Sequence, residues 1–184
     1  MAPPVLFRVL YSTPTPTAHQ VRRLESYPAL LPGYQRHKVR YADYPAIRHA
    51  PSTCSVRGTI VSGLSERDMK RLDTFEGSEY IRVKVTCRKL EKKEDVKGGE
   101  EEEHPYGDLG GMVLGKRVEA EVYVWVGGND NLEEGEWDFQ HFVKEKMSRW
   151  VGGRREEWDE GMRGMFICRN LEDEFVGLML TPIF

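Results

Sequence analysis

The chain has 184 residues, of which 39% are hydrophobic and 31% are charged, and its formal net charge at pH 7 is −3. These values are typical of one globular domain with a sizeable core, and they exclude an overall electrostatic attraction to nucleic acid or anionic membranes. No apolar run approaches the roughly 20 residues of a membrane-spanning helix, and the N-terminus lacks the pattern of a secretion signal. We therefore expect a soluble, cytoplasmic protein.

The cysteines and histidines give no sign of a disulfide framework or of a metal site. Cys54, Cys87 and Cys168 are far apart and have no paired spacing, which suits a reducing compartment. The five histidines show no His-Glu-x-x-His motif or other ligand spacing. No P-loop, Gly-x-Ser-x-Gly or Gly-x-Gly-x-x-Gly motif is present either, which removes the common hydrolase and nucleotide-binding readings.

The first 50 residues mix short apolar segments with proline-rich turns. Residues 5–11 fit either the start of a helix or a strand, and the Pro/Thr stretch at 12–17 predicts a loop. Residues 34–40 predict a strand, whose alternation also explains the interleaved bases and aromatics there without a nucleic-acid partner. Pro45 disfavours a helical conformation at Tyr44, so this pair is expected to be extended.

The segment from residue 56 to residue 76 predicts a strand followed by a short helix. Val56 and its neighbours form the strand, which Gly58 and Gly63 interrupt. Ser65 is a good N-cap, and Asp68 is placed as in a capping box, so a helix is expected from there to about Asp73.

Two alternating segments follow this helix and predict paired, half-buried strands. Ile81, Val83 and Val85 alternate with polar residues, and 118–126 repeats the pattern. Glu76 lies where the helix gives way to the first of these strands. An acid that serves only solubility rarely needs such a position.

The remaining segments predict a flexible insert, a helix and an extension. Residues 89–111 are charged, Gly-rich and without period, which indicates a flexible connection rather than an acidic interaction tag. Aromatic and apolar residues recur at helical spacing over 131–151. Residues 152–184 fit no pattern, so we predict one domain over 1–151 and a C-terminal extension of unknown structure. The order of elements predicts an α+β fold with a mostly antiparallel sheet or small barrel.

Three stretches resemble the gamma-glutamylcyclotransferase-like family, including its avirulence-induced-gene branch: "GYQRHKVRYADYPAI", "SVRGTIVSGLSERDMKRLDTFEGSEYIRVKV" and "AEVYVWVGG". The most specific part is the pattern "LD.FEG.EY.R..V", and the similarity extends from Met1 to about Val151. The resemblance implies a small mixed β-barrel flanked by helices, with no metal and no cofactor. It also implies that Glu76 transfers protons and that Tyr44, Pro45 and Tyr80 line the substrate pocket.

In this family a gamma-glutamyl amide or amine is converted to 5-oxoproline when the substrate's own α-amine attacks its γ-carbonyl, an acyltransferase or lyase type of reaction. The resemblance implies that Glu76 takes a proton from the α-ammonium and returns one to the departing amine. Burial at the mouth of a barrel should raise the pKa of such a carboxyl group. Which gamma-glutamyl compound is the substrate stays open, as does the oligomeric state.

One departure from the family pattern affects the expected activity. Family members begin with a strand and a Tyr-Gly-Thr/Ser-Leu loop, whereas Tyr11-Ser12-Thr13 lacks the Gly and the Leu and follows Pro3-Pro4. We therefore expect the first strand and its loop to be missing, together with the backbone amides that would stabilise an oxyanion. The alternative function is a non-catalytic barrel that binds a small ligand or a protein partner.

Overall fold

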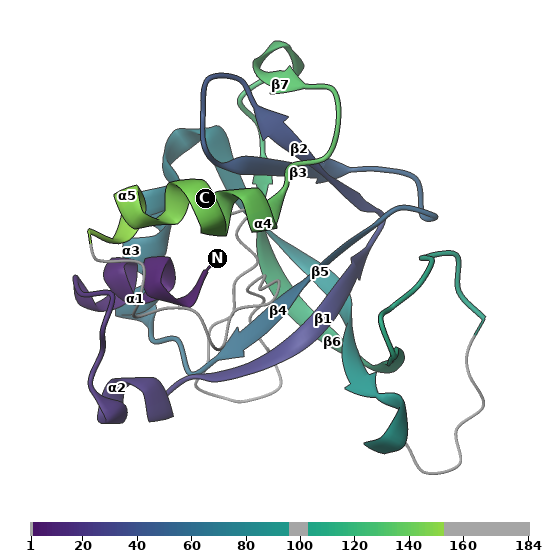
Figure 1. Cartoon of the computed structure of the whole chain (residues 1–184), viewed down its shortest axis with the longest axis horizontal. Coiled ribbons are helices and arrows are strands. Elements are labelled where there is room, and N and C mark those ends of the chain that lie inside the picture. Colours follow the sequence, from purple (N-terminus) through teal and green to yellow (C-terminus); the bar gives the residue numbers. More distant parts are fainter. Residues whose placement is uncertain (1, 96–102, 153–184) are drawn as a thin grey trace.

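The computed structural model describes residues 2–95 and 103–152 of the chain (Figure 1). Its α- and π-helical segments are α1 (Pro3–Tyr11), α2 (Ala18–Arg22), α3 (Glu66–Glu76), α4 (Phe139–His141), the π-helix η4 (Phe142–Lys146) and α5 (Met147–Val151). Its 3₁₀ turns are η1 (Gly77–Glu79), η2 (Lys93–Asp95) and η3 (Asn129–Asn131). Its strands are β1 (Glu25–Pro32), β2 (Tyr34–Val39), β3 (Pro45–His49), β4 (Ser55–Ser62), β5 (Tyr80–Lys92), β6 (Met112–Trp125) and β7 (Leu132–Glu133). None of these helices is long and apolar enough to cross a membrane.

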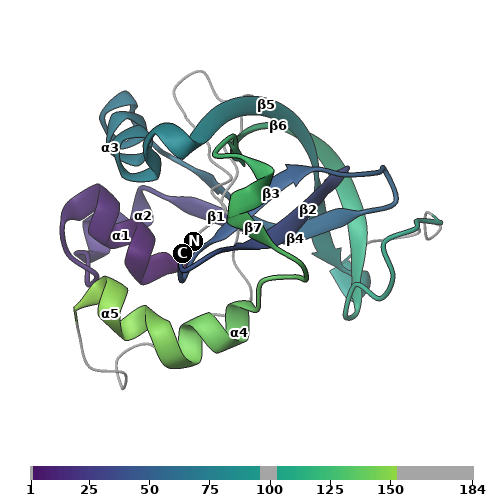
Figure 2. The same cartoon turned by 90° about the horizontal axis from the view of Figure 1, so that it is seen from above.

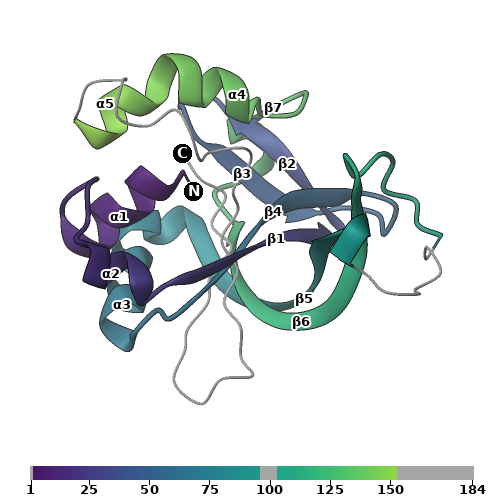
Figure 3. The same ribbon diagram turned by 60° about the horizontal axis from the view of Figure 1, so that its bottom comes forward.

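The strands form two antiparallel sheets, with the orders β4-β1-β5-β6 and β3-β2-β7. Figures 1 and 2 place the helices at one end of the molecule and the tip of the β5–β6 hairpin at the other. Figure 3 shows that β5 and β6 bend strongly beneath β1 and β4. The predicted α+β class with mostly antiparallel pairing is thus confirmed.

The two sheets do not close into a true barrel, so the barrel geometry expected from the sequence is corrected to two separate sheets. The break falls at Pro32 and Gly33, between β1 and β2. Pro32 has no N–H to donate to a ladder, and Gly33 has φ +73°, a conformation that side chains with a Cβ rarely adopt. The chain therefore turns out of the first sheet, and β2 pairs with β3 instead of continuing beside β4.

The N-terminal segment is helical, which decides between the two conformations allowed by the sequence. Pro3 stands in the first turn of α1, where its missing N–H costs no intrahelical hydrogen bond. Ser12 ends the helix in the left-handed conformation and donates its N–H to the Arg8 carbonyl. Tyr11 and Ser12 thus form a helix end and not a Tyr-Gly-Thr-Leu loop. The absence of a first strand stays a prediction.

Helix α3 has the start that the sequence predicts and ends one turn later than expected. The Ser65 hydroxyl accepts a hydrogen bond from the Asp68 N–H, and the Asp68 carboxylate accepts one from the Ser65 N–H, so the capping box is confirmed. Gly77 follows the helix with φ +71°. Glu76 is therefore the last residue of α3, directly before η1 and the start of β5.

The predicted insert and the predicted helix after it have other bounds in the structure than in the sequence analysis. Strand β5 extends to Lys92 and pairs there with Met112, so the first four residues of the predicted insert 89–111 belong to the sheet. Residues 96–102 lie outside the described part, as do residues 153–184 of the predicted extension. The helical region of 131–151 begins only at Phe139, because the Asp138 side chain accepts hydrogen bonds from the Gln140 and His141 N–H groups and caps it.

Two main hydrophobic clusters hold these elements together. One lies between the sheets and includes Ile47, Ile60 and Val122. The other lies between the helices and the adjoining strands, and it contains Leu10 of α1, Leu72 of α3 and other residues, namely Tyr80, Tyr123, Trp125, Phe142 and Met147. Helix α3 is thus packed against α1 and the ends of β5 and β6, which fixes the position of its last residue.

Gly63 offers a test of how the chain enters α3. A Cβ at Gly63 would lie 1.9 Å from the Arg23 carbonyl oxygen, and its φ is +89°. Gly128 has nearly the same φ, +90°, but open space around it. We expect Gly63→Ala to lower the free energy of unfolding by about 2–4 kcal/mol and Gly128→Ala by about 1 kcal/mol, measured by urea denaturation. Equal losses would show that backbone conformation alone, and not the contact with Arg23, constrains this turn.

Candidate active site

Glu76 is a buried acid on the apolar face of α3. Met69, Leu72 and Glu76 recur at helical spacing, so the fold that buries the first two also buries the third. Only 5% of Glu76 is exposed. Among the described residues, neither of its carboxylate oxygens has a hydrogen-bond partner. The structure therefore keeps a carboxyl group out of water and leaves both of its oxygens unengaged.

This environment favours the neutral acid. Desolvation by burial raises the pKa of Glu76 well above its ordinary value. Glu76 also lies at the C-terminus of α3, where the helix dipole disfavours a negative charge. Its carboxyl group accordingly holds its proton to a higher pH than an exposed glutamate does, as general acid–base catalysis near neutral pH requires.

The structure gathers the other three residues expected at the site. The Tyr80 hydroxyl donates a buried hydrogen bond of 3.0 Å to the Pro45 carbonyl, which ties the start of β5 to the start of β3. Burial is the largest cause of the raised pKa of Tyr80, and the charges of Glu76 and then of Tyr44 raise it further. Tyr44 is half-buried, and its pKa is raised by burial and by its interaction with the Glu79 carboxylate. Tyr44, Tyr80 and Glu76 thus act on one another electrostatically.

Aromatic rings hold the two tyrosines in place. The Tyr80 ring packs edge-on against Trp125, with 5.1 Å between the ring centroids. The Tyr44 ring meets Trp150 of α5 in the same manner at 6.5 Å. The indole N–H of Trp137 donates a hydrogen bond of 2.9 Å to the Asp43 carbonyl, beside Tyr44. Trp137 and Trp150, which both follow β7 in the chain, therefore hold the Tyr44–Pro45 segment in place.

Tyr123 is a further member of this group, and it was missed in the sequence. Its hydroxyl donates a hydrogen bond to the Asp73 carboxylate. Burial is the largest cause of the raised pKa of Tyr123, and the hydrogen bond to Asp73, the charge of Asp73 and the charge of Glu76 raise it further. Arg82 lies 3.6 Å from the same Asp73 carboxylate. Tyr123 could have been recognised from its position on β6. It lies on the face opposite to Val122 and Val124, together with Trp125, and this face packs into the helical cluster.

Two of the cavities that described residues line do not include Glu76. One lies between α1 and α3, and the other lies beside the β5–β6 hairpin. Over the described ranges, no group of three or more His, Cys, Asp or Glu side chains has an arrangement that could hold a metal ion. The groups gathered around Glu76 are instead hydroxyl and carboxyl groups, which move protons and donate hydrogen bonds.

The burial of Glu76 makes stability depend on pH in a defined direction. The folded pKa lies above the unfolded value of about 4.3, so the folded state binds more protons and its free energy of unfolding falls as pH rises above that value. Glu76→Gln removes this dependence. We therefore expect the variant to gain stability relative to the wild type as pH rises from about 4.5 to 8, with a slope of at most ~1.4 kcal/mol per pH unit. Urea denaturation across that range measures it.

The control for this measurement is Glu134→Gln, which makes the same change at an exposed acid outside the helices and strands. Its difference in stability from the wild type should change with pH much less than that of Glu76→Gln. If the two differences change with pH to the same extent, then the burial of Glu76 does not govern its protonation.

Comparisons with known proteins identify the family of this chain. Residues 13–139 match the family model described as "Gamma-glutamyl cyclotransferase, AIG2-like". Protein AIG2 C of Arabidopsis thaliana is 28% identical over 162 residues, which cover 87% of this chain and 81% of that protein. AIG2-like protein B of the same plant is 26% identical over 123 residues, covering 67% of this chain and 58% of that protein. A solution structure of another Arabidopsis thaliana protein aligns over 72% of this chain and 67% of its own, with 28% identity and a TM-score of 0.42. The chain therefore belongs to the gamma-glutamyl cyclotransferase, AIG2-like family.

Proposed function

We propose that this protein is a gamma-glutamylcyclotransferase, which releases 5-oxoproline from a gamma-glutamyl amide or amine with Glu76 as acid and base. Family membership supports the reaction class. The observation that carries the residue assignment is that Glu76 is buried, has a raised pKa and has no hydrogen-bond partner among the described residues. A carboxyl group used only for structure would have such partners, since leaving it unpaired costs stability.

The reaction asks for two proton transfers at one place. The ionised carboxylate of Glu76 accepts a proton from the substrate's α-ammonium, and the freed amine nitrogen attacks the γ-carbonyl carbon to form a C–N bond and close a five-membered ring. The bond between that carbon and the leaving nitrogen then breaks. Glu76 returns a proton to the leaving amine, and the ring nitrogen gives up its second excess proton, which the released amine takes up as it becomes an ammonium ion. Glu76 thus ends in the state in which it began.

The buried position of Glu76 suits both steps. A cationic α-ammonium bound beside the carboxyl group favours its ionised form, while the dry surroundings favour the neutral acid once the ammonium has given up its proton. One group can therefore act as base early and as acid late. The ring closure is intramolecular, so holding the amine near the carbonyl can supply ~7–11 kcal/mol of the barrier without a further catalytic group.

Tyr44, Pro45 and Tyr80 are proposed to position the substrate. The hydrogen bond from Tyr80 to the Pro45 carbonyl fixes the starts of β5 and β3 relative to each other. Both tyrosine hydroxyls have raised pKa values and stay protonated, so they can donate or accept hydrogen bonds but do not compete with Glu76 for protons near neutral pH.

The proposal is tested by release of 5-oxoproline from a panel of gamma-glutamyl compounds: glutathione, gamma-glutamyl amino acids and gamma-glutamyl-lysine. We expect at least one of them to be turned over, and Glu76→Gln to lower kcat by roughly 10²–10⁴-fold, which is the usual contribution of a general acid–base group. Mass spectrometry of the product measures the rate directly.

Glu66→Gln serves as the matched control, since it makes the same change at an exposed position of α3, and it should retain the wild-type rate. Equal turnover by Glu76→Gln and the wild type would contradict the role of Glu76. Binding of a gamma-glutamyl compound by both proteins, with no turnover by either, would instead favour the non-catalytic alternative.

A further inference from the structure

The outer face of α3 borders a cavity that the proposed reaction does not use. This cavity has a volume of about 550 Å³ and lies between α1 and α3. It is lined by Val9, Ser12, Arg67, Lys70, Arg71, Thr74 and Phe75. Because Glu76 belongs to the buried face of α3, the cavity and the proposed active site lie on different faces of one helix. We call this cavity the α1–α3 groove.

The charge in the α1–α3 groove is one-sided. Arg67, Lys70 and Arg71 are spaced three and four residues apart, so they share one face of α3, and like charges at this spacing destabilise a helix. Two of the acids of α3 are engaged with other groups. Asp68 pairs with Arg23 at 2.6 Å, and Asp73 interacts with Tyr123 and Arg82. Within the described part of the chain, neither Arg67 nor Lys70 has an ion-pair partner.

Arg71 has a defined structural position at the back of the groove. Its guanidinium donates a hydrogen bond to the Leu10 carbonyl at the end of α1, one of the carbonyls that a helix C-terminus leaves without an internal partner. This bond joins α1 to α3 and holds Arg71 in place. A ligand in the groove would therefore meet a guanidinium that is already ordered, and it would not have to immobilise that side chain itself.

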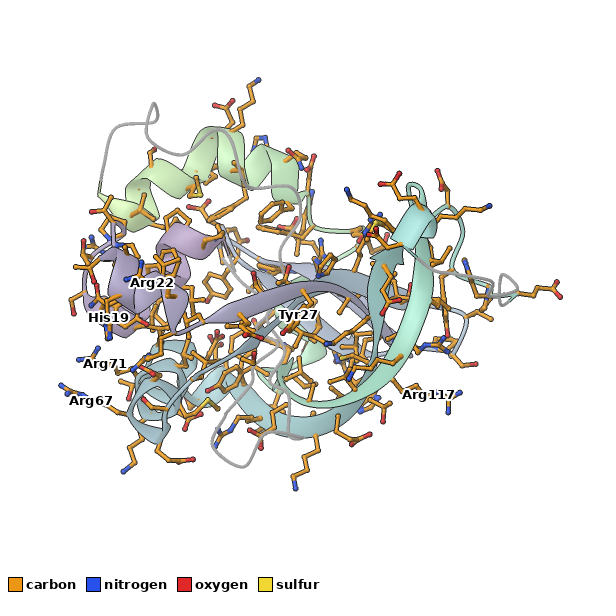
Figure 4. The ribbon with its side chains drawn as sticks, turned by 90° about the horizontal axis from the view of Figure 1, so that it is seen from below. His19, Arg22, Tyr27, Arg67, Arg71 and Arg117 are labelled. Carbon is orange, nitrogen blue, oxygen red and sulfur yellow. The ribbon has the colours of Figure 1, made fainter. Side chains whose placement is uncertain are left out.

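The positive surface continues beyond the groove. Figure 4 shows Arg67 and Arg71 at the same end of the molecule as His19 and Arg22 of α2, while Arg117 lies at the opposite end. Arg22, Arg67 and Arg71 thus lie at one end of a chain whose formal net charge is −3 (Figure 4). Cationic groups gathered in this way attract anions.

From these observations we propose that the α1–α3 groove binds a small organic molecule that carries a phosphate group. Two guanidinium groups and an ammonium group on one helix face match a dianionic phosphate better than a single carboxylate, and guanidinium groups bind phosphate oxygens in pairs. The Ser12 and Thr74 hydroxyls supply further donors. Val9 and Phe75 give the groove an apolar surface, which fits an organic body and not a free inorganic ion.

The test compares phenyl phosphate, inorganic phosphate and phenol as probes of the full chain, with binding followed by the backbone amide signals of Ser12, Thr74 and Phe75 in NMR titrations. We expect phenyl phosphate to bind more tightly than inorganic phosphate and phenol to cause no saturable shift. In Arg67→Gln/Lys70→Gln, the affinity for phenyl phosphate should fall at least about tenfold, because two charge-assisted interactions are lost.

The matched control is Lys38→Gln/Lys84→Gln, which removes the same net charge from exposed positions on β2 and β5. It should change the affinity less than about twofold, since distant exposed charges are screened by salt. Equal weakening in both double variants would overturn the groove as the site. Equal affinity of the wild type for inorganic and phenyl phosphate would overturn the organic ligand. None of these readouts requires turnover, so the outcome is independent of the role proposed for Glu76.

Discussion

The constraint on which the rest of the structure depends is the burial of one carboxyl group that has no hydrogen-bond partner among the described residues. Glu76 lies on the same helical face as Met69 and Leu72, so α3 cannot pack its apolar residues without also taking this acid out of water. Such a group does not stabilise the folded protein, because burying a carboxyl group without hydrogen bonds is unfavourable. Protonation removes the charge but leaves the loss of hydration. The chemistry that we propose at that group would account for its position.

The surrounding elements fix where this acid lies. The capping box formed by Ser65 and Asp68 sets the start of α3. Arg23, in the segment before β1, forms an ion pair with the Asp68 carboxylate. Gly77 then ends the helix and lets the chain pass through η1 into β5. At the other side, the bond between Tyr80 and the Pro45 carbonyl joins the two sheets close to the acid. The capping box and the turn at Gly77 are local, whereas the contacts of Arg23 and Tyr80 join distant parts of the chain, and together they hold Glu76 where α3 passes into β5.

The parts of this arrangement that depend on local patterns could be predicted from the sequence. The cap and the apolar spacing of α3 lie within one short segment, 65–76, which is why both the helix and the position of Glu76 at its junction with a strand were predicted. Tyr123 was missed because β6 is buried on both faces near its end, so alternation marks one face as apolar and gives no reason to single out the other. The open pair of sheets was missed because strand pairing is decided by distant contacts. Trp137 was expected to lie in the helix over 131–151, but the cap at Asp138 makes the helix begin only at Phe139.

The central claim is that the Glu76 carboxyl group stays protonated well above the ordinary range in the folded protein, and carbon-13 NMR measures this most directly. The carboxyl carbon of Glu76 can be assigned as the signal that disappears in Glu76→Gln and then followed as pH is raised from about 4 to 9. We predict a signal that stays at its protonated position at pH values where a free glutamate side chain, with a pKa of about 4.3, is ionised, and that shifts only at higher pH. A signal that shifts near the free value would contradict the claim.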